Sequence, residues 1–130
     1  MPHLHVVGAV VLRGKEVLAA RRGESRYPYV AHKFEFVGGK VEQGESEEEA
    51  LVRELREELG VKARVIGHFK RVSHDYPDFS ITLSAYFCEF LSDFSCTEHE
   101  ELRWIPLSEL DPEAWAPADA PLVQSLKTLL

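Results

Sequence analysis

The chain has 130 residues and a formal net charge of -7, with 45% hydrophobic and 28% charged residues. This composition suits a single globular domain over residues 1–130, and the net negative charge argues against binding polymeric nucleic acid. No apolar run approaches the roughly 20 residues that span a bilayer, and the N-terminus lacks the pattern of a signal peptide. Because the two cysteines also show no disulfide or metal spacing, we expect a cytoplasmic protein that does not bind membranes.

The first forty residues read as strands joined by turns. Residues 4–12 are apolar and β-branched, and residues 17–22 resume that pattern after a polar turn, which predicts a hairpin. Residues 23–33 are polar, contain a proline and read as a surface loop. Residues 34–39 alternate and end in paired glycines, which predicts one short strand.

A helix follows with clear signals at both ends. Ser46 and Glu49 have the spacing of a capping box, and Gly60 is placed to end the helix. Between them, apolar residues recur at helical spacing, at Ala50, Leu51, Leu55 and Leu59.

The rest of the chain returns to strands before a last helix. Residues 61–72 and 80–91 are rich in β-forming residues, with residues 73–79 turning between them. Residues 101–107 predict another short strand, and residues 120–130 an amphipathic helix. Strands around two helices indicate an α+β fold in which helices cover a mixed sheet.

The segment from residue 38 to residue 61 is unusually acidic. Residues three and four apart share one helix face, so Glu54, Glu57 and Glu58 project together. One interpretation is a solvated helix of mixed charge, in which Arg53 relieves Glu57; composition alone favours it. The other is a magnesium site, because Mg²⁺ takes carboxylate and carbonyl oxygens. The segment holds eight glutamates: Glu42, Glu45, Glu47, Glu48, Glu49, Glu54, Glu57 and Glu58.

The spacing of these residues distinguishes the two interpretations. From Gly39 the sequence runs through five residues to Glu45, then seven more to the stretch RELREELGV at residues 53–61. This resembles the Nudix hydrolase signature at every constrained position. The resemblance implies a Nudix-type mixed β-sheet packed between helices, an α/β/α sandwich. It also implies hydrolysis of a nucleoside diphosphate linked to another group, with Mg²⁺ as cofactor and Mn²⁺ as a possible substitute.

The resemblance also implies roles for individual residues. Metal-bound water has a lowered pKa, and a nearby ionised carboxylate can take its proton. Arg53 is expected to orient the ligands, with Glu45 as further support. Glu98 resembles a loop carboxylate that joins the metal site, although its acidic neighbours also fit a solvated loop. The expected ligands are the Gly38 carbonyl and the carboxylates of Glu54, Glu57, Glu58 and Glu98.

Segments outside the signature resemble the MutT and CTP pyrophosphohydrolase branches of the family. These segments are LAARR, AHKFEFVGGKVEQGE, YPDFSITL and WAPADAPLV. The resemblance implies that a small-molecule nucleoside triphosphate is converted to monophosphate and pyrophosphate, as in nucleotide-pool sanitation. We expect a monomer or weak dimer.

Five residues are predicted to contact substrate by this resemblance. Arg22 and Lys40 are placed to meet phosphate, although either also suits an ordinary surface. Phe36 and Ile81 are candidate apolar walls for a base, or core residues. Asp119 stands where MutT carries asparagine; its carboxylate can accept from the amine of cytosine, or it can cap the last helix.

Three hypotheses remain for function. The first is a pyrophosphohydrolase of free nucleotides. The second is an RNA-end hydrolase with the same signature, which the negative net charge disfavours. The third is a non-catalytic nucleotide-binding module, which has no chemical need for the complete glutamate set.

Overall fold

The computed structural model describes residues 2–95 and 101–129. Within these residues, two α-helices and two short 3-10 helices accompany the strands. The elements are β1 (His3–Arg13), β2 (Glu16–Arg21), β3 (Phe34–Glu35), β4 (Gly38–Lys40), α1 (Glu47–Leu59), β5 (Ala63–Asp75), β6 (Ser80–Phe90), β7 (Glu101–Pro106), η1 (Leu107–Glu109), η2 (Pro112–Ala114) and α2 (Ala120–Lys127). Within the described residues, no helix is long and apolar enough to cross a bilayer.

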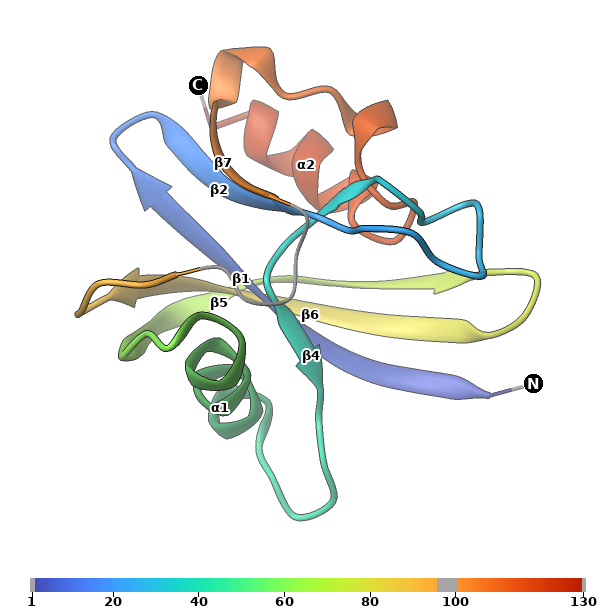
Figure 1. The fold of residues 1–130 in the computed structure, drawn as a ribbon, viewed down its shortest axis with the longest axis horizontal. Helices are drawn as coiled ribbons and strands as arrows, with labels where there is room; N and C mark the ends of the chain where they lie inside the picture. The colour runs from blue at the N-terminus through green and yellow to red at the C-terminus, as the bar shows by residue number, and fades with distance from the viewer. Residues whose placement is uncertain (1, 96–100, 130) are drawn as a thin grey trace.

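The strands form a seven-stranded mixed sheet organised around β1. Its main order is β3-β2-β1-β6-β5, with β4 added to β1 and β7 added to β2. Along one edge, β1 pairs in parallel with β6 over nine residues. The opposite edge of β1 is shared, because Val6–Gly8 pairs with β4 whereas Leu12 and Arg13 pair with β2. Figure 1 shows β1 running diagonally between the two halves of the sheet.

Both faces of the sheet are covered. Successive residues of a strand point to opposite faces, so Val7, Ala9 and Val11 pack on the α1 side while Val10 packs with α2. The two helices lie on opposite sides of the sheet in Figure 1. This arrangement confirms the predicted α+β class and the α/β/α sandwich.

Three predicted boundaries were wrong. The single strand expected over residues 34–39 is two strands, because Phe34–Glu35 pairs with β2 whereas Gly38–Lys40 pairs with β1. The chain crosses between these partners at Phe36 and Val37. β5 extends to Asp75, since its end pairs with Ser80 of β6, and this shortens the predicted turn. α2 ends at Lys127 rather than residue 130.

Candidate active site

Local interactions fix both ends of α1. The Ser46 side chain accepts from the Glu49 backbone N–H at 3.1 Å, and the Glu49 side chain accepts from the Ser46 N–H at 2.9 Å. Gly60 ends the helix in the left-handed region, with φ of 63°. Leu51, Leu55 and Leu59 are fully buried against the sheet. The predicted capping box and apolar stripe are thus confirmed.

Arg53 organises the acidic face. Its Nε donates to Glu45 at 2.7 Å, and its Nη1 donates to Glu54 at 2.9 Å and Glu57 at 3.1 Å. Its Nη2 donates to Glu45 at 3.0 Å and to the backbone carbonyl of Lys40 at 3.0 Å. The bonds to Glu45 raise the pKa of Arg53, and those from Arg53 lower the pKa of Glu45. One guanidinium therefore ties α1, the loop before it and β4 together.

The two glycines of β4 are required by close approach. A Cβ atom on Gly39 would lie 2.4 Å from the carboxyl carbon of Glu54, and one on Gly38 would lie 1.9 Å from the Val7 carbonyl oxygen. The first neighbour is the end of a side chain, whereas the second is backbone. The glycine strand thus passes directly beneath a predicted metal ligand.

The predicted ligands form an oxygen-rich set that suits a hard divalent cation. Glu54 and Glu57 share the Arg53 guanidinium, and the Oε2 atom of Glu58 is buried. Among residues 2–95 and 101–129, no group of three or more acidic, histidine or cysteine side chains lies close enough to hold a metal as it stands. Glu98 lies outside the described residues. In this arrangement, the positive charge of Arg53 lies between the carboxylates of Glu54 and Glu57.

A second polar cluster lies on the other face of the sheet. Asp119 is 7% exposed, and its Oδ2 accepts from the Phe36 backbone N–H at 3.1 Å. Arg22, the residue after β2, donates to both carboxylate oxygens of Glu35 at 3.2 and 3.3 Å. Burial and the Glu35 charge raise the pKa of Asp119 to about 8, although the Phe36 N–H and Arg22 oppose the shift. Burial therefore favours the neutral, protonated form of Asp119.

The structure excludes one of the two roles predicted for Asp119, that of capping the last helix with its side chain. Asp119 precedes α2, but its side chain makes no capping hydrogen bond. The interpretation of Asp119 as a side-chain cap is wrong, because its carboxyl group accepts instead from the Phe36 backbone N–H, between β3 and β4. Sequence reasoning also missed Glu35, whose charge acts on both Arg22 and Asp119. An acid between two phenylalanines on a short strand was the available signal.

The other residues predicted to contact substrate, Phe36, Ile81 and Lys40, lie in different parts of the fold. Phe36 is 4% exposed and packs on Trp115, with ring centroids 4.6 Å apart, so it lies in the core. Ile81 is half-buried against the cluster that contains Tyr76. Lys40 is exposed, and its backbone carbonyl rather than its side chain contacts Arg53.

Aromatic side chains join the loop after β2 to the turn between β5 and β6. Tyr29 stacks on Tyr76 at 4.9 Å, and Tyr27 contacts Phe79 at 5.3 Å. The Tyr76 hydroxyl accepts from the Ala118 backbone N–H at 3.0 Å, next to Asp119. This contact brings the aromatic cluster to the edge of the Asp119 site, which the sequence pattern did not indicate.

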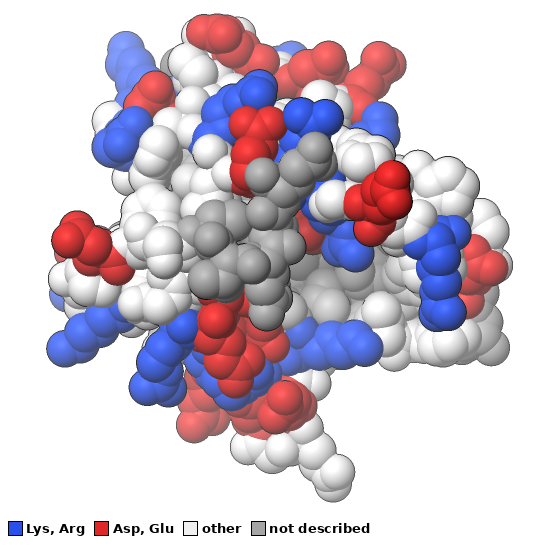
Figure 2. Space-filling model, in the orientation of Figure 1, with Lys and Arg blue, Asp and Glu red and all other residues white. Residues whose placement is uncertain are grey.

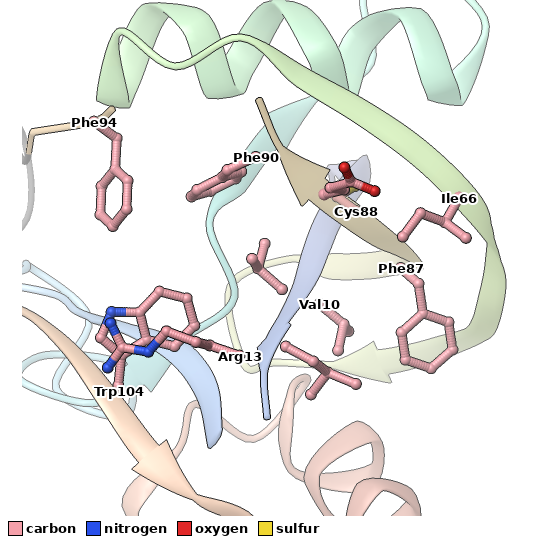
Figure 3. A pocket seen from close by; sticks show the side chains of 11 residues that line it. Val10, Arg13, Ile66, Phe87, Cys88, Phe90, Phe94 and Trp104 are labelled. Carbon is pink, nitrogen blue, oxygen red and sulfur yellow. The ribbon is translucent and has the colours of Figure 1, made fainter. Parts of the chain in front are cut away.

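A cavity of about 450 Å³ lies at the C-terminal end of β1, and none of the predicted site residues that the structure describes lines it. Figure 3 shows Arg13 beside Trp104 in this cavity; the guanidinium carbon is 4.2 Å from the ring centroid. The predicted carboxylates of α1 lie elsewhere: Glu57 is exposed, Glu54 is half-buried, and the Oε2 atom of Glu58 is buried. Figure 2 shows acidic and basic side chains interleaved on the part of the surface where Figure 1 places α1.

The chain belongs to the Nudix family: a sequence model of the NUDIX domain matches residues 2–126. It is 39% identical to the CTP pyrophosphohydrolase of Escherichia coli strain K12, over 99% of this chain and 95% of that protein. It is 33% identical to the 8-oxo-dGTP diphosphatase of the same organism, over 95% of each chain. The solution structure of the E. coli ORF135 protein superposes with a TM-score of 0.85 at 36% identity, covering 99% of this chain and 91% of that one.

These relationships establish the chain as a Nudix hydrolase. Hydrolases of this family generally use a divalent metal ion. The signature predicted from Gly39 to Val61 coincides with β4, the following loop and α1. The expected family membership is therefore confirmed.

Proposed function

We propose that this Nudix hydrolase converts nucleoside triphosphates to monophosphate and pyrophosphate, using Mg²⁺, for which Mn²⁺ can substitute. The observation that carries the proposal is the Arg53 cluster, which gathers Glu45, Glu54 and Glu57 beside the glycines of β4. Support also comes from the two relatives named for 8-oxo-dGTP and CTP hydrolysis, which align over nearly the whole chain.

The Gly38 carbonyl and the carboxylates of Glu54, Glu57 and Glu58 would hold the metal. When bound, a divalent ion supplies Lewis acidity toward phosphate and lowers the pKa of attacking water. Arg53 fixes the direction of Glu54 and Glu57, and Glu45 in turn holds Arg53 in place. An ionised carboxylate of this set accepts the proton of the attacking water.

Arg22 and Lys40 supply positive charge for the phosphates. The Arg22 side chain is 42% exposed, and its pairing with Glu35 occupies one side of the guanidinium. Lys40 follows Gly38 and Gly39 in β4, so it lies next to the place where the metal would bind. Because the whole chain is acidic, these local cations matter for attracting a polyanionic substrate.

Asp119 is proposed to read the base. A protonated carboxyl group can donate one hydrogen bond and accept others. It therefore matches an edge that presents an amine beside a ring nitrogen, as cytosine does. This chemistry favours cytidine triphosphates, including modified dCTP, while an oxidised guanine that offers both a donor and an acceptor remains a second candidate substrate.

The test is a panel of nucleotides in the presence of Mg²⁺, with monophosphate and pyrophosphate measured directly in oxygen-18 water. Inorganic phosphate as the primary product contradicts the proposed reaction. Turnover of capped RNA but not of free nucleotides supports an RNA-end hydrolase, and binding without turnover supports a non-catalytic module.

The role of Asp119 in base recognition has its own test. Asp119→Asn should change the ratio of kcat/KM between CTP and 8-oxo-dGTP by about 10-fold or more. An unchanged ratio excludes Asp119 from base recognition.

A further inference from the structure

The first residue of α1 has a carboxylate that is withdrawn from solvent. The Glu47 side chain is 12% exposed, whereas its neighbours Glu48 and Glu49 are exposed. His5 Nε2 on β1 lies 2.5 Å from Glu47 Oε2, and the Tyr86 hydroxyl on β6 donates to Oε1 at 2.7 Å. Arg71 on β5 reaches both oxygens at 2.9 Å. Three strands therefore meet at one carboxylate.

This carboxylate is held in its charged form. Burial raises the pKa of Glu47, but hydrogen bonds from His5, Tyr86, Ser84 and Arg71 outweigh that effect and lower it to about 2. A negative charge at the start of a helix is also favoured by the helix dipole. The apolar stripe of α1 begins only at Ala50. Polar contacts, rather than apolar packing, therefore hold the first turn of α1 on the sheet.

The same contacts connect α1 to the glycine strand. The His5 carbonyl accepts from the Val41 N–H at 3.0 Å, directly after β4. Val6, the next residue of β1, pairs with Lys40, whose carbonyl accepts from Arg53. His5 thus touches the end of β4 through its backbone and the start of α1 through its side chain. Glu47 and Arg53 form two separate ties between α1 and the β1–β4 pair.

We propose that Glu47, held by His5, Arg71 and Tyr86, is a positioning residue that sets the separation between the metal-binding carboxylates of α1 and the Gly38 carbonyl of β4. The inference rests on the metal site of the proposed function. Glu47 acts through the helix, because it lies two turns before Glu54 and faces the sheet rather than the Arg53 cluster. Metal binding needs ligands at fixed separations, so loss of this tie should weaken it.

The experiment compares Glu47→Gln with Glu48→Gln. Both changes remove one charge from the first turn of α1, but only Glu47→Gln alters the side chain that is hydrogen-bonded to His5, Arg71 and Tyr86. Mn²⁺ binding followed by electron paramagnetic resonance, without substrate, gives the metal Kd. We expect the Kd to rise about 10-fold in Glu47→Gln and less than about 2-fold in Glu48→Gln. Tyr86→Phe removes one donor while retaining the charge, and should give an intermediate rise.

Kinetics supply a second readout. At saturating nucleotide, Glu47→Gln should need more Mg²⁺ for half-maximal rate, while KM for the nucleotide stays near the wild-type value. Equal metal Kd in the two glutamine variants overturns the inference, as does a lower Tm of Glu47→Gln with an unchanged Kd. If Glu47→Gln does not fold, an unchanged Kd in Tyr86→Phe overturns it. Failure of the wild type to bind Mn²⁺ overturns the proposed metal site itself, and this inference with it.

Discussion

Replacing Asp119 by asparagine should stabilise the protein at neutral pH. The pKa of the buried carboxyl group is raised from 3.8 to about 8, mainly by burial and by the Glu35 charge. Between these values the folded protein keeps a proton that the unfolded chain releases. Stability contributed by this proton is complete below pH 3.8 and is lost as pH rises toward 8. Asparagine carries no such proton, and its carbonyl can still accept from the Phe36 N–H.

The magnitude follows from the distance between pH 7 and the unfolded pKa. About three pH units at about 1.4 kcal/mol each give about 4 kcal/mol of destabilisation in the wild type at pH 7. The amide of asparagine brings a buried NH₂ group, and leaving it unpaired costs about 1–3 kcal/mol. The net gain for Asp119→Asn is therefore about 1–3 kcal/mol, or several degrees in Tm.

Chemical denaturation of both proteins from pH 5 to pH 8.5 measures this effect. The other titrating groups, such as Glu45 and Glu47, are common to both proteins, so the difference between them isolates residue 119. The variant should gain stability relative to the wild type as pH rises, and should lose its advantage near pH 5. A difference in unfolding free energy that does not vary with pH refutes the assignment of a protonated Asp119.

Four further substitutions test the acidic face of α1 and the glycines of β4. Glu57→Gln should lower turnover about 100-fold or more at saturating Mg²⁺ with little change in Tm, because its side chain is 57% exposed; near-normal turnover removes Glu57 from the metal set. Arg53→Lys keeps the charge but cannot reproduce the forked contacts, so kcat should fall about 10- to 100-fold. The free energy of unfolding in urea should fall by about 1–3 kcal/mol. An unchanged free energy of unfolding contradicts the role of Arg53 in holding α1 to β4. Gly39→Ala should lose activity while remaining folded, because the Glu54 side chain can move, whereas Gly38→Ala should lower Tm strongly, because its neighbour is backbone; calorimetry showing the opposite order contradicts this account.

Features coded by local sequence could be predicted. The ends of α1 follow from Ser46 and Gly60, whose interactions close within a few residues. The hairpin of β1 and β2 and the burial of the α1 leucines follow in the same way from turn chemistry and spacing. The proposed site could be placed on the chain as far as the Nudix signature extends, because the residues of the signature share one strand, one loop and one helix.

Features that depend on distant partners could not be predicted. Residues 34–39 alternate like one strand, and nothing local shows that their two halves pair with different strands. The contact of Asp119 with Phe36 joins residues 83 positions apart. Glu47 looks like any other acid in a helix first turn, and its partners come from β1, β5 and β6. These contacts arise only when the sheet has assembled.

The alternation of side chains along β1 has a consequence for how this enzyme can change. Val7 and Ala9 pack with the buried leucines of α1, the helix that carries the proposed metal-binding carboxylates, whereas Val6 and Val10 pack with α2 and the core that includes Phe36. Under the proposed function, neighbouring positions on one strand would serve two separate tasks, cleavage on one side and selection of the base on the other. Substitutions on the α2 side would then alter which nucleotide is accepted while leaving the hydrolytic chemistry intact, so new substrates could evolve one face at a time.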